Sequence, residues 1–509
     1  MSARRDFLRS FCCIAFGMAA SVPLEAVSGL HRPLDLLNRR AASDLPGEGA
    51  IELESANSRL VDGFRWAKWQ ALQYVRNTGS VRRWYEAALL GRNAFCMRDV
   101  SHMSTGAQFL GLGARTRNML HLFAQHISAS KEWCSWWEIT GEDEPAQIDY
   151  RSDHDFWYDL PANFDVLDAC YRQWLWSRDN FYIDDPVFLN YYRRTVSSYV
   201  EAWDRKHNGL LDHLPSDGHM GIGTYDEDLQ DNVSVGADLL AAQYAAYRDY
   251  AEMARARGDG AGASDFAGKA EALKSLYNQK WWDPTRQAFW GALGAEGQFE
   301  KETGTGRSTM EFPLYYGLPD PGAKTQCSLD RLEQQLHPGR AAQHGIIGGV
   351  EGVSYLPDIF YKYGRSRSAW TVLLALIDPH LKRREYPEVS FTVAGNIGSG
   401  LMGISPSPQP NTVETLPQLT SETEWAALHH VPVGNNTISI RHTQTHKTEL
   451  TSESGGDLTW KATFPGAWTT LLVDRRAVPA RQETRAGGYR VSWCEITVRT
   501  GETHVAEHT

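Results

Sequence analysis

The sequence has little that would hold a nucleic acid, a nucleotide phosphate or a catalytic metal. After the first ten residues it contains no long run of Lys or Arg, and 62 acidic against 51 basic residues give a net charge of -11. A protein that follows a nucleic-acid backbone needs a basic stripe, so we expect no nucleic-acid partner. The phosphate-binding Gly-rich loop, the His-Glu-x-x-His zinc motif and the Ser nucleophile elbow are also missing. We therefore predict no cofactor and no metal site.

Cysteine is scarce, with seven residues in the chain. Cys12 and Cys13 fall in the N-terminal apolar segment, which leaves an odd number that cannot all pair. No two of the others have the spacing of a metal site. We expect them to be mainly buried free thiols, with one disulfide left open: Cys96, Cys134, Cys170, Cys327 and Cys494.

Long hydrophobic runs are absent as well. The apolar run from 11 to 22 is interrupted by Gly17 and closed by Pro23, whereas a membrane-spanning helix needs about 20 apolar residues. Arg4 and Arg5 precede this run in a twin-arginine pattern. We expect a bacterial signal peptide over 1–30, export to the periplasm or the medium, and no stable membrane insertion.

Aromatic residues, by contrast, are plentiful: the chain has 18 Trp and 21 Tyr. Trp combines a flat apolar face with one N–H donor, which suits the C–H face of a pyranose ring, although most such rings fill helix interfaces. With 42% hydrophobic residues and a mean hydropathy of -0.44, the chain is predicted to be globular. Its 509 residues indicate two or three domains.

The hydrophobic pattern divides the chain into parts. Residues 31–55 lack periodicity and are predicted to be a linker or surface strap. From Ser58 to Arg76 apolar residues recur every three or four positions, as in an amphipathic helix. Further helices are expected near 103–126, 163–177, 187–204, 232–257, 262–280, 329–336 and 366–378. We assign 56–405 to a helical toroid and 406–509, with its alternating patterns, to a β-sandwich with hairpin turns at Gly455-Gly456 and Gly487-Gly488.

The first cluster whose side chains are suited to catalysis or binding is Arg98, Asp99 and His102, at the expected start of a helix. Asp99 and His102 lie one turn apart on one face. Arg98 is expected to keep Asp99 ionised and to bind sugar hydroxyls, and a buried ion pair explains the cluster equally well.

Two further clusters mix acids and aromatic rings. Asp155 and Trp157 combine hydroxyl acceptors with a stacking ring, as carbohydrate sites do. Tyr225 and Glu227 lie in a Gly-rich acidic loop, where neighbouring carboxylates should raise the pKa of Glu227 toward that of a general acid. A solvated acidic helix start is the alternative.

The fourth cluster surrounds Glu388. Pro387 is expected to stop a helix and leave Glu388 on an irregular segment, where acids are more often functional than structural. We predict Glu388 as a catalytic base, and Tyr386 and Glu414 as substrate-binding residues.

These residues together carry a resemblance. Met97-Arg98-Asp99 early in the helical part, Trp281-Trp282-Asp283 later, and a late Glu before a β-domain resemble the six-hairpin glycosidase superfamily, bacterial α-L-rhamnosidases in particular. Rhamnosidases carry Asp-Cys-Pro-x-Arg-x-Glu where this chain has Phe95-Cys96-Met97-Arg98-Asp99. The resemblance implies an (α/α)6 toroid and inverting hydrolysis by two carboxyl groups.

We therefore predict a glycoside hydrolase whose partner is an oligosaccharide or glycoside with a rhamnoside-like, glucuronide or glucoside linkage. Glu388 is the expected base and Glu227, ahead of Asp99, the expected acid. Two alternatives remain: a polysaccharide lyase on a similar toroid, and a glycan-binding protein without activity. Paired carboxylates favour hydrolysis, because a lyase would surround its acidic substrate with cations.

Overall fold

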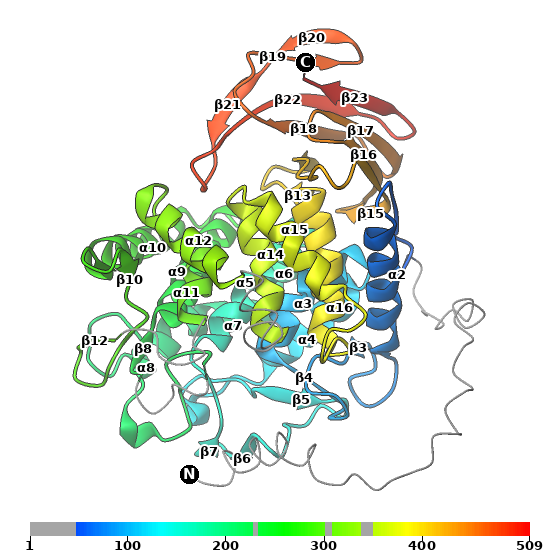
Figure 1. Ribbon diagram of the computed structural model, residues 1–509. Helices are drawn as coiled ribbons and strands as arrows, with labels where there is room; N and C mark the ends of the chain where they lie inside the picture. Colours follow the sequence, from blue (N-terminus) through cyan, green and yellow to red (C-terminus); the bar gives the residue numbers. More distant parts are fainter. Residues whose placement is uncertain (1–46, 227–232, 301–307, 337–349, 509) are drawn as a thin grey trace, which may run out of the picture. The chain divides into compact units, whose positions relative to one another are not determined.

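The computed structural model describes residues 47–226, 233–300, 308–336 and 350–508, all within one unit running from Asp44 to Thr509. The helical part comes first along the chain and a sheet-rich region follows it (Figure 1). The predicted signal peptide at 1–30 lies outside the described residues. Within those residues, no helix is both long and apolar enough to cross a membrane.

Six buried helices pack against one another in a closed ring. Each contacts the next in chain order, and the last contacts the first. The ring helices are α3 (Met97–Phe109), α5 (Ala162–Ser177), α9 (Ala237–Ala256), α11 (Ser308–Tyr316), α14 (Val350–Lys362) and α16 (Pro387–Gly395). Apolar residues cover most of their surfaces, because a helix enclosed by neighbours has no solvent-facing side.

Outer helices alternate with the ring helices along the chain and pack around them. They are α2 (Ser58–Gln73), α4 (Gly113–Gln125), α7 (Pro186–Arg194), α8 (Val200–Trp203), α10 (Gly260–Lys280), α12 (Ala323–Gln335) and α15 (Ser366–Leu376). Short helical turns are η2 (Ala129–Lys131), α6 (Phe181–Asp184), η3 (Thr195–Tyr199), η4 (Pro215–Asp217) and η6 (Asn396–Leu401). The helix expected over 103–126 is two helices, because Gly111 adopts a left-handed φ of 76° between them.

Short strands in small two- and three-stranded sheets lie in the loops of the helical part, where few strands were expected. They are β2 (Val75–Arg76), β3 (Trp84–Tyr85), β4 (Ala94–Cys96), β5 (Glu138–Thr140), β6 (Tyr150–Ser152), β7 (Asp155–Phe156), β8 (Val235–Gly236), β9 (Trp282–Asp283), β10 (Ala288–Phe289), β11 (Ala292–Leu293) and β12 (Phe299–Glu300). Strand β4 pairs with β5 and leads directly into α3, so that ring helix begins at the end of this strand pair.

The C-terminal region consists of two sheets. Their strands are β13 (Ser405–Pro406), β14 (Thr412–Thr415), β15 (Trp425–Val433), β16 (Asn436–Thr443), β17 (Lys447–Ser454), β18 (Leu458–Pro465), β19 (Thr470–Val473), β20 (Arg476–Pro479), β21 (Arg481–Thr484), β22 (Arg490–Val498) and β23 (Thr503–Glu507). One sheet has the order β1-β15-β16-β17-β23-β19-β20 and the other β13-β14-β18-β22-β21. The two sheets contact each other where Phe464 and Trp468 pack on His508.

Two expectations about this region need correction. The predicted linker at 31–55 ends in strand β1 (Glu52–Ser55), whose Leu53 is buried and which pairs with β15 of the first sheet. Gly455-Gly456 is not a hairpin turn, because β17 and β18 on its two sides belong to different sheets. Gly487-Gly488 does join a hairpin, between β21 and β22, as predicted.

The five cysteines within the described residues are free thiols, and all except the half-buried Cys327 are buried. This confirms the expectation of mainly buried free thiols.

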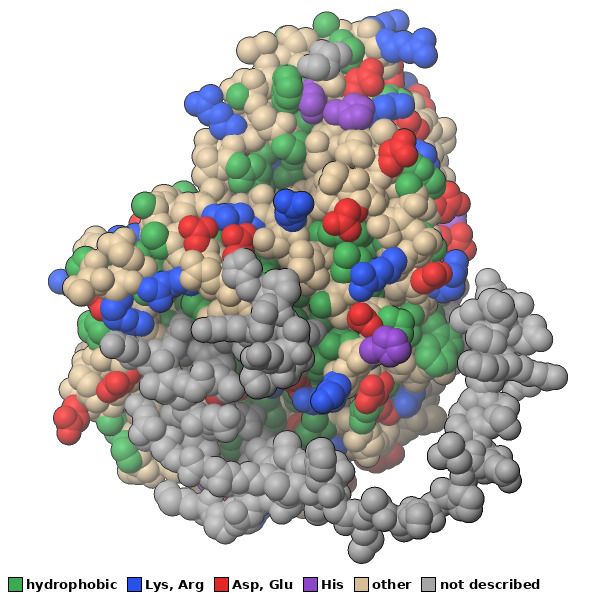
Figure 2. All heavy atoms as spheres, viewed as in Figure 1, with side chains coloured by type: hydrophobic (Ala, Val, Ile, Leu, Met, Phe, Trp, Pro, Cys, Tyr) green, Lys and Arg blue, Asp and Glu red, His purple; other side chains and the backbone are tan. Residues whose placement is uncertain are grey.

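Figure 2 shows acidic and basic side chains mixed over the visible face of the molecule.

Candidate active site

Each helix of the ring carries a carboxylate in its first turn. These residues are Asp99, Asp165, Asp238, Glu311, Glu351 and Glu388. The principal outer helices, α2, α4, α7, α10, α12 and α15, have none there. A helix N-terminus favours negative charge, but that effect alone would serve outer helices equally well. The acids therefore mark one end of the ring as chemically distinct.

Asp99 is 1% exposed, in the first turn of α3. The Tyr386 hydroxyl donates to its Oδ2 at 2.7 Å, and Nε of Arg98 lies 4.0 Å from Oδ1. Burial, and next the charge of Glu388, raise the pKa of Asp99 to about 7. This corrects the expectation that Arg98 keeps Asp99 ionised, since desolvation and the charge of Glu388 together outweigh the effect of the Arg98 guanidinium on the pKa of Asp99.

Glu388 is also 1% exposed and lies in the first turn of α16. We expected Pro387 to leave it on an irregular segment, but Pro387 is the first residue of the helix. Proline suits that position because its missing N–H would have no partner there and its φ is already helical. Glu388 Oε1 lies 2.6 Å from His102 Nδ1, and Oε2 has no hydrogen-bond partner among the described residues.

His102 lies between two carboxylates inside the ring. Its Nε2 is 3.7 Å from Asp358 on α14, and its ring stacks on Tyr355 with centroids 3.3 Å apart. Burial alone would lower the pKa of His102, but interactions with Asp358 and Glu388 raise it above its ordinary value. With 1% of its side chain exposed, His102 is placed to orient Glu388, whereas we predicted that it binds substrate.

Asp165 is a buried acid near the start of α5 that was not among the predicted site residues. It accepts a hydrogen bond from the Tyr225 hydroxyl and another, at 2.5 Å, from Tyr316. Burial raises its pKa to about 7 in spite of these two donors. The ring of Tyr225 also stacks on Phe312, with centroids 4.1 Å apart. Tyr225, a predicted site residue, is thus brought to this buried acid.

Asp238 has a structural role. It accepts hydrogen bonds from the Thr224 hydroxyl and from the backbone N–H of Tyr225, and so fixes the loop that carries Tyr225. Burial raises its pKa to about 6. Glu351 is paired with Arg383 near the surface.

Three predicted residues lie apart from the Asp99–Glu388 pair. Trp157 packs edge-on against Trp137, and the Arg98 guanidinium lies over the Trp137 ring at 5.7 Å. Trp157 thus holds in place the ring that Arg98 contacts. Asp155 pairs with His219 at 3.0 Å on the β6–β7 hairpin. Glu414 lies on β14 of the second sheet and is bonded to Arg485. Glu227, our favoured acid, lies outside the described residues.

The site therefore holds buried carboxyl groups with raised pKa values beside a carboxylate that a histidine orients. Asp99 Oδ1, Asp165 Oδ2 and Glu388 Oε2 have no hydrogen-bond partners within the described ranges. Such atoms carry an energetic cost unless a ligand or water meets them. Among the same residues, no group of three or more potential ligands is arranged to hold a metal.

Part of the chain matches a known protein family. Residues 224–346 match the family model of the mannosylglycerate hydrolase MGH1-like glycoside hydrolase domain. No curated protein sequence matches the chain.

Solved structures share the fold at low sequence identity. The α-L-rhamnosidase from Dictyoglumus thermophilum matches with a TM-score of 0.57 and 13% identity over 90% of this chain and 50% of that chain. The α-L-rhamnosidase from Aspergillus terreus matches with a TM-score of 0.56 and 14% identity, over 89% of this chain and 50% of that chain. The GH78 family rhamnosidase of Bacillus sp. GL1 matches with a TM-score of 0.54 and 13% identity, over 80% of this chain and 42% of that chain. The chain thus spans half or less of the length of these structures.

The chain is therefore similar to glycoside hydrolases in the domain at 224–346 and to α-L-rhamnosidases in its fold. The predicted resemblance to rhamnosidase-like glycosidases is confirmed by the matched domain and by the shared fold.

Proposed function

We propose that this protein is an inverting glycoside hydrolase in which Asp99 is the general acid and Glu388 the general base. The observation that carries the proposal is the buried pair itself. Two carboxyl groups on adjacent ring helices, α3 and α16, interact electrostatically, and each keeps one oxygen without a hydrogen-bond partner among the described residues. Glycoside hydrolysis needs two such groups with separate roles.

The environments of the two acids support this division of roles. A pKa of about 7 keeps a large share of Asp99 protonated near neutral pH, as a proton donor to a leaving group must be. Glu388 faces His102, whose raised pKa favours an imidazolium that stabilises the carboxylate of Glu388. A carboxylate held in this way can accept a proton from the attacking water.

The proposal also covers the toroid architecture, the substrate, the export route and the domain boundaries. The closed ring with alternating outer helices is consistent with an (α/α)6 toroid. The substrate is a glycoside with a rhamnoside-like, glucuronide or glucoside linkage, to which the mannosylglycerate hydrolase name of the matched domain adds a mannoside. Export through the twin-arginine route, with domains at 56–405 and 406–509, completes the proposal.

The test is hydrolysis of a panel of aryl glycosides, with mannosylglycerate and plant and algal polysaccharides added. Glu388→Gln should lower turnover by about 10²- to 10⁴-fold, because the amide cannot accept a proton. Glu351→Gln is the matched control, since Glu351 occupies the same turn of another ring helix but is paired with Arg383 at the surface. Proton NMR of the first product should show the inverted anomer.

Other outcomes separate the alternatives. A product that absorbs in the near ultraviolet would identify a lyase, and binding without any product would identify a glycan-binding protein. Normal turnover of the Glu388→Gln variant on a true substrate would exclude the assigned base.

A further inference from the structure

A cavity lies at the end of the ring opposite the first-turn acids. Its volume is about 430 Å³, within the range of small-molecule sites, roughly 300 to 1,000 Å³. Ring residues that line it come from later turns of their helices, such as Thr105, Arg172 and Asp358. Ser405 and Glu414, from β13 and β14, line it from the sheet-rich region. Asp99, Glu388 and Tyr386 do not line it, so the cavity is distinct from the Asp99–Glu388 pair, to which Asp358 and His102 connect it.

Aromatic rings supply much of the wall. Tyr171 and Tyr315 come from the ring helices and Tyr489 from the β21–β22 turn. The Tyr489 ring packs closely over Gly364, where a Cβ would meet it at 2.7 Å, so the ring is held in a defined place. Flat aromatic faces of this kind match the C–H faces of a pyranose.

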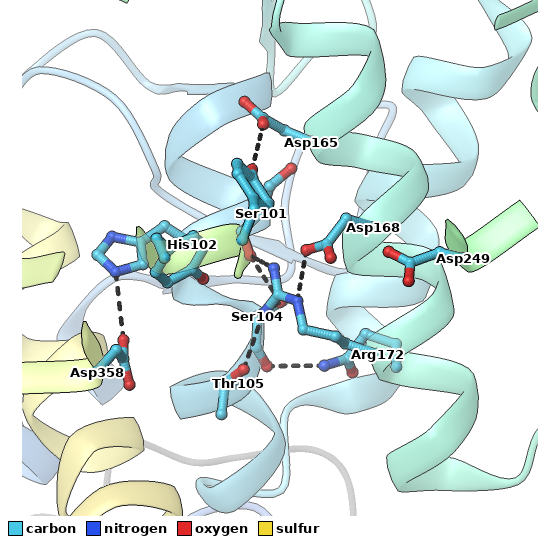
Figure 3. A network of polar contacts seen from close by, with 12 residues as sticks. Ser101, His102, Ser104, Thr105, Asp165, Asp168, Arg172, Asp249 and Asp358 are labelled. Atoms are coloured by element: carbon cyan, nitrogen blue, oxygen red, sulfur yellow. Dashed lines mark hydrogen bonds and ion pairs between the residues drawn. The ribbon is translucent and has the colours of Figure 1, made fainter. Parts of the chain in front are cut away.

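The cations around the cavity already have partners. Arg172 donates to Asp168 at 2.7 Å and to Thr105 at 2.9 Å (Figure 3). Arg485 bonds to Glu414 and lies 2.8 Å from Glu483, and Lys362 donates to the Tyr315 carbonyl at 2.7 Å. An anionic ligand would have to displace these partners, which disfavours it.

Two polar side chains in the cavity wall, Tyr361 and Asp358, are suited to bind the hydroxyl groups of a ligand. The Tyr361 side chain is 2% exposed and lines the cavity, and its hydroxyl has no hydrogen-bond partner in the part of the chain that the structure describes. Asp358 also lines the cavity, with 29% of its side chain exposed and Oδ2 3.7 Å from His102. A buried hydroxyl and an accessible carboxylate are the donor and acceptor that sugar hydroxyls need.

We propose that this cavity is a second binding site, which takes a neutral mono- or disaccharide. The ligand stacks on the tyrosine rings, bonds to the Tyr361 hydroxyl and donates a hydroxyl hydrogen to Asp358. Asp358 contacts His102 (Figure 3). Since His102 in turn contacts Glu388, an occupant of this site lies two side chains from the proposed base.

Calorimetric titration of the full chain with glucose, mannose and rhamnose tests the proposal, with glucuronate as the anionic counterpart of glucose. Saturable binding of a neutral sugar is expected. Tyr361→Phe should weaken that binding by about two- to tenfold through the lost hydrogen bond, and Tyr489→Leu by removal of a stacking face. Glucuronate should bind less tightly than glucose.

Tyr182→Phe is the matched control. Tyr182 is a buried tyrosine whose hydroxyl also has no hydrogen-bond partner among the described residues, and it does not line the cavity. Its removal should leave sugar binding unchanged. A crystal soaked in the bound sugar should place it against Tyr361 and Asp358.

Three results would overturn the proposal: no saturable binding of a neutral sugar, equal binding by wild type and by both cavity variants, or tighter binding of glucuronate than of glucose. The inference does not require hydrolysis. A protein that cleaves glycosides but lacks a Tyr361-dependent site refutes the second site alone, and one that binds sugar through Tyr361 but cleaves nothing refutes the proposed activity alone.

Discussion

The two ends of the helical ring use charge in opposite ways. Where the ring helices begin, Asp99, Asp165 and Glu388 are buried with oxygens that have no hydrogen-bond partners in the described residues. Where the ring meets the sheets, Arg172 and Arg485 are each paired with a carboxylate. The raised pKa values of Asp99 and Asp165 suit proton transfer, whereas neutralised charges among aromatic rings suit binding. We therefore propose that the ring carries out chemistry at one end and binds a ligand at the other.

The largest effect is expected from Asp99→Asn, which removes the carboxyl group of Asp99 from the acidic end of the ring. Turnover should fall by about 10²- to 10⁴-fold, because the amide has no proton to give to the leaving group. In the wild type, turnover should decline as pH rises through about 7, the pKa of Asp99. The variant's residual rate should lack that decline. Rates measured from pH 5 to 9 check both points, and an unchanged high-pH limb in the variant would assign the acid elsewhere.

Gly106→Ala tests whether both ends depend on the same helix contact. A Cβ at Gly106 of α3 would lie 1.8 Å from the Phe391 carbonyl oxygen of α16, so the two helices must separate. We expect a loss of about 3 kcal/mol in the free energy of unfolding, measured with urea, and damage to turnover as well as to sugar binding.

The control for that variant is Gly268→Ala. Gly268 lies on α10, and a Cβ added there would have no neighbouring atom within 4 Å. The same substitution there should stabilise the protein slightly, by about 0.5 to 1 kcal/mol. Equal effects at both sites would show that the α3–α16 contact is not as close as described.

The raised pKa of Asp99 should also appear in stability. The folded pKa of about 7 exceeds the ordinary value of 3.8, so the stability present below pH 3.8 is lost progressively as pH rises through 7. Asp99→Asn lacks this loss. Its free energy of unfolding, relative to wild type, should therefore rise by about 2 to 3 kcal/mol between pH 5 and pH 8. A constant difference across that range would mean that Asp99 ionises normally.

The smallest effect is expected at the sheet end. The Asn57 side chain caps α2 by accepting from the Leu60 N–H at 3.1 Å and donates to the Glu422 carbonyl. Asn57→Ala should cost about 1 kcal/mol in the free energy of unfolding and leave turnover within twofold of wild type. A large loss of turnover would contradict the separation of the two ends.

Local patterns made much of the fold predictable. The spacing of apolar residues identified α2 and α5, and alternation identified the strands after 425, because both patterns report burial on one face. Pro387 was misjudged because proline ends some helices and begins others, and only the following residues distinguish the two.

The site was less accessible to sequence reasoning. Asp99 and Glu388 were predicted as site residues from their sequence neighbours, but Asp358 and Tyr316 had no local signal. Asp358 matters because it faces His102 across the ring, which is a tertiary relation between residues far apart in the chain. The direction of the pKa shift of Asp99 likewise depends on Glu388, on another helix, and adjacent Arg98 suggested the opposite.

Strand β1 has a consequence for the order in which the protein is made. Ser55 Oγ donates to the Trp425 carbonyl at 2.9 Å, across 370 residues of chain. On the ribosome, β1 emerges first and its partner β15 only after every ring helix. Its backbone groups have no sheet partner during that interval, and exposed edges of this kind invite wrong pairing. In a chain truncated before residue 425, the edge of β1 would stay uncovered permanently. We therefore expect the helical part to aggregate when it is produced on its own, unless β1 is removed together with the sheets.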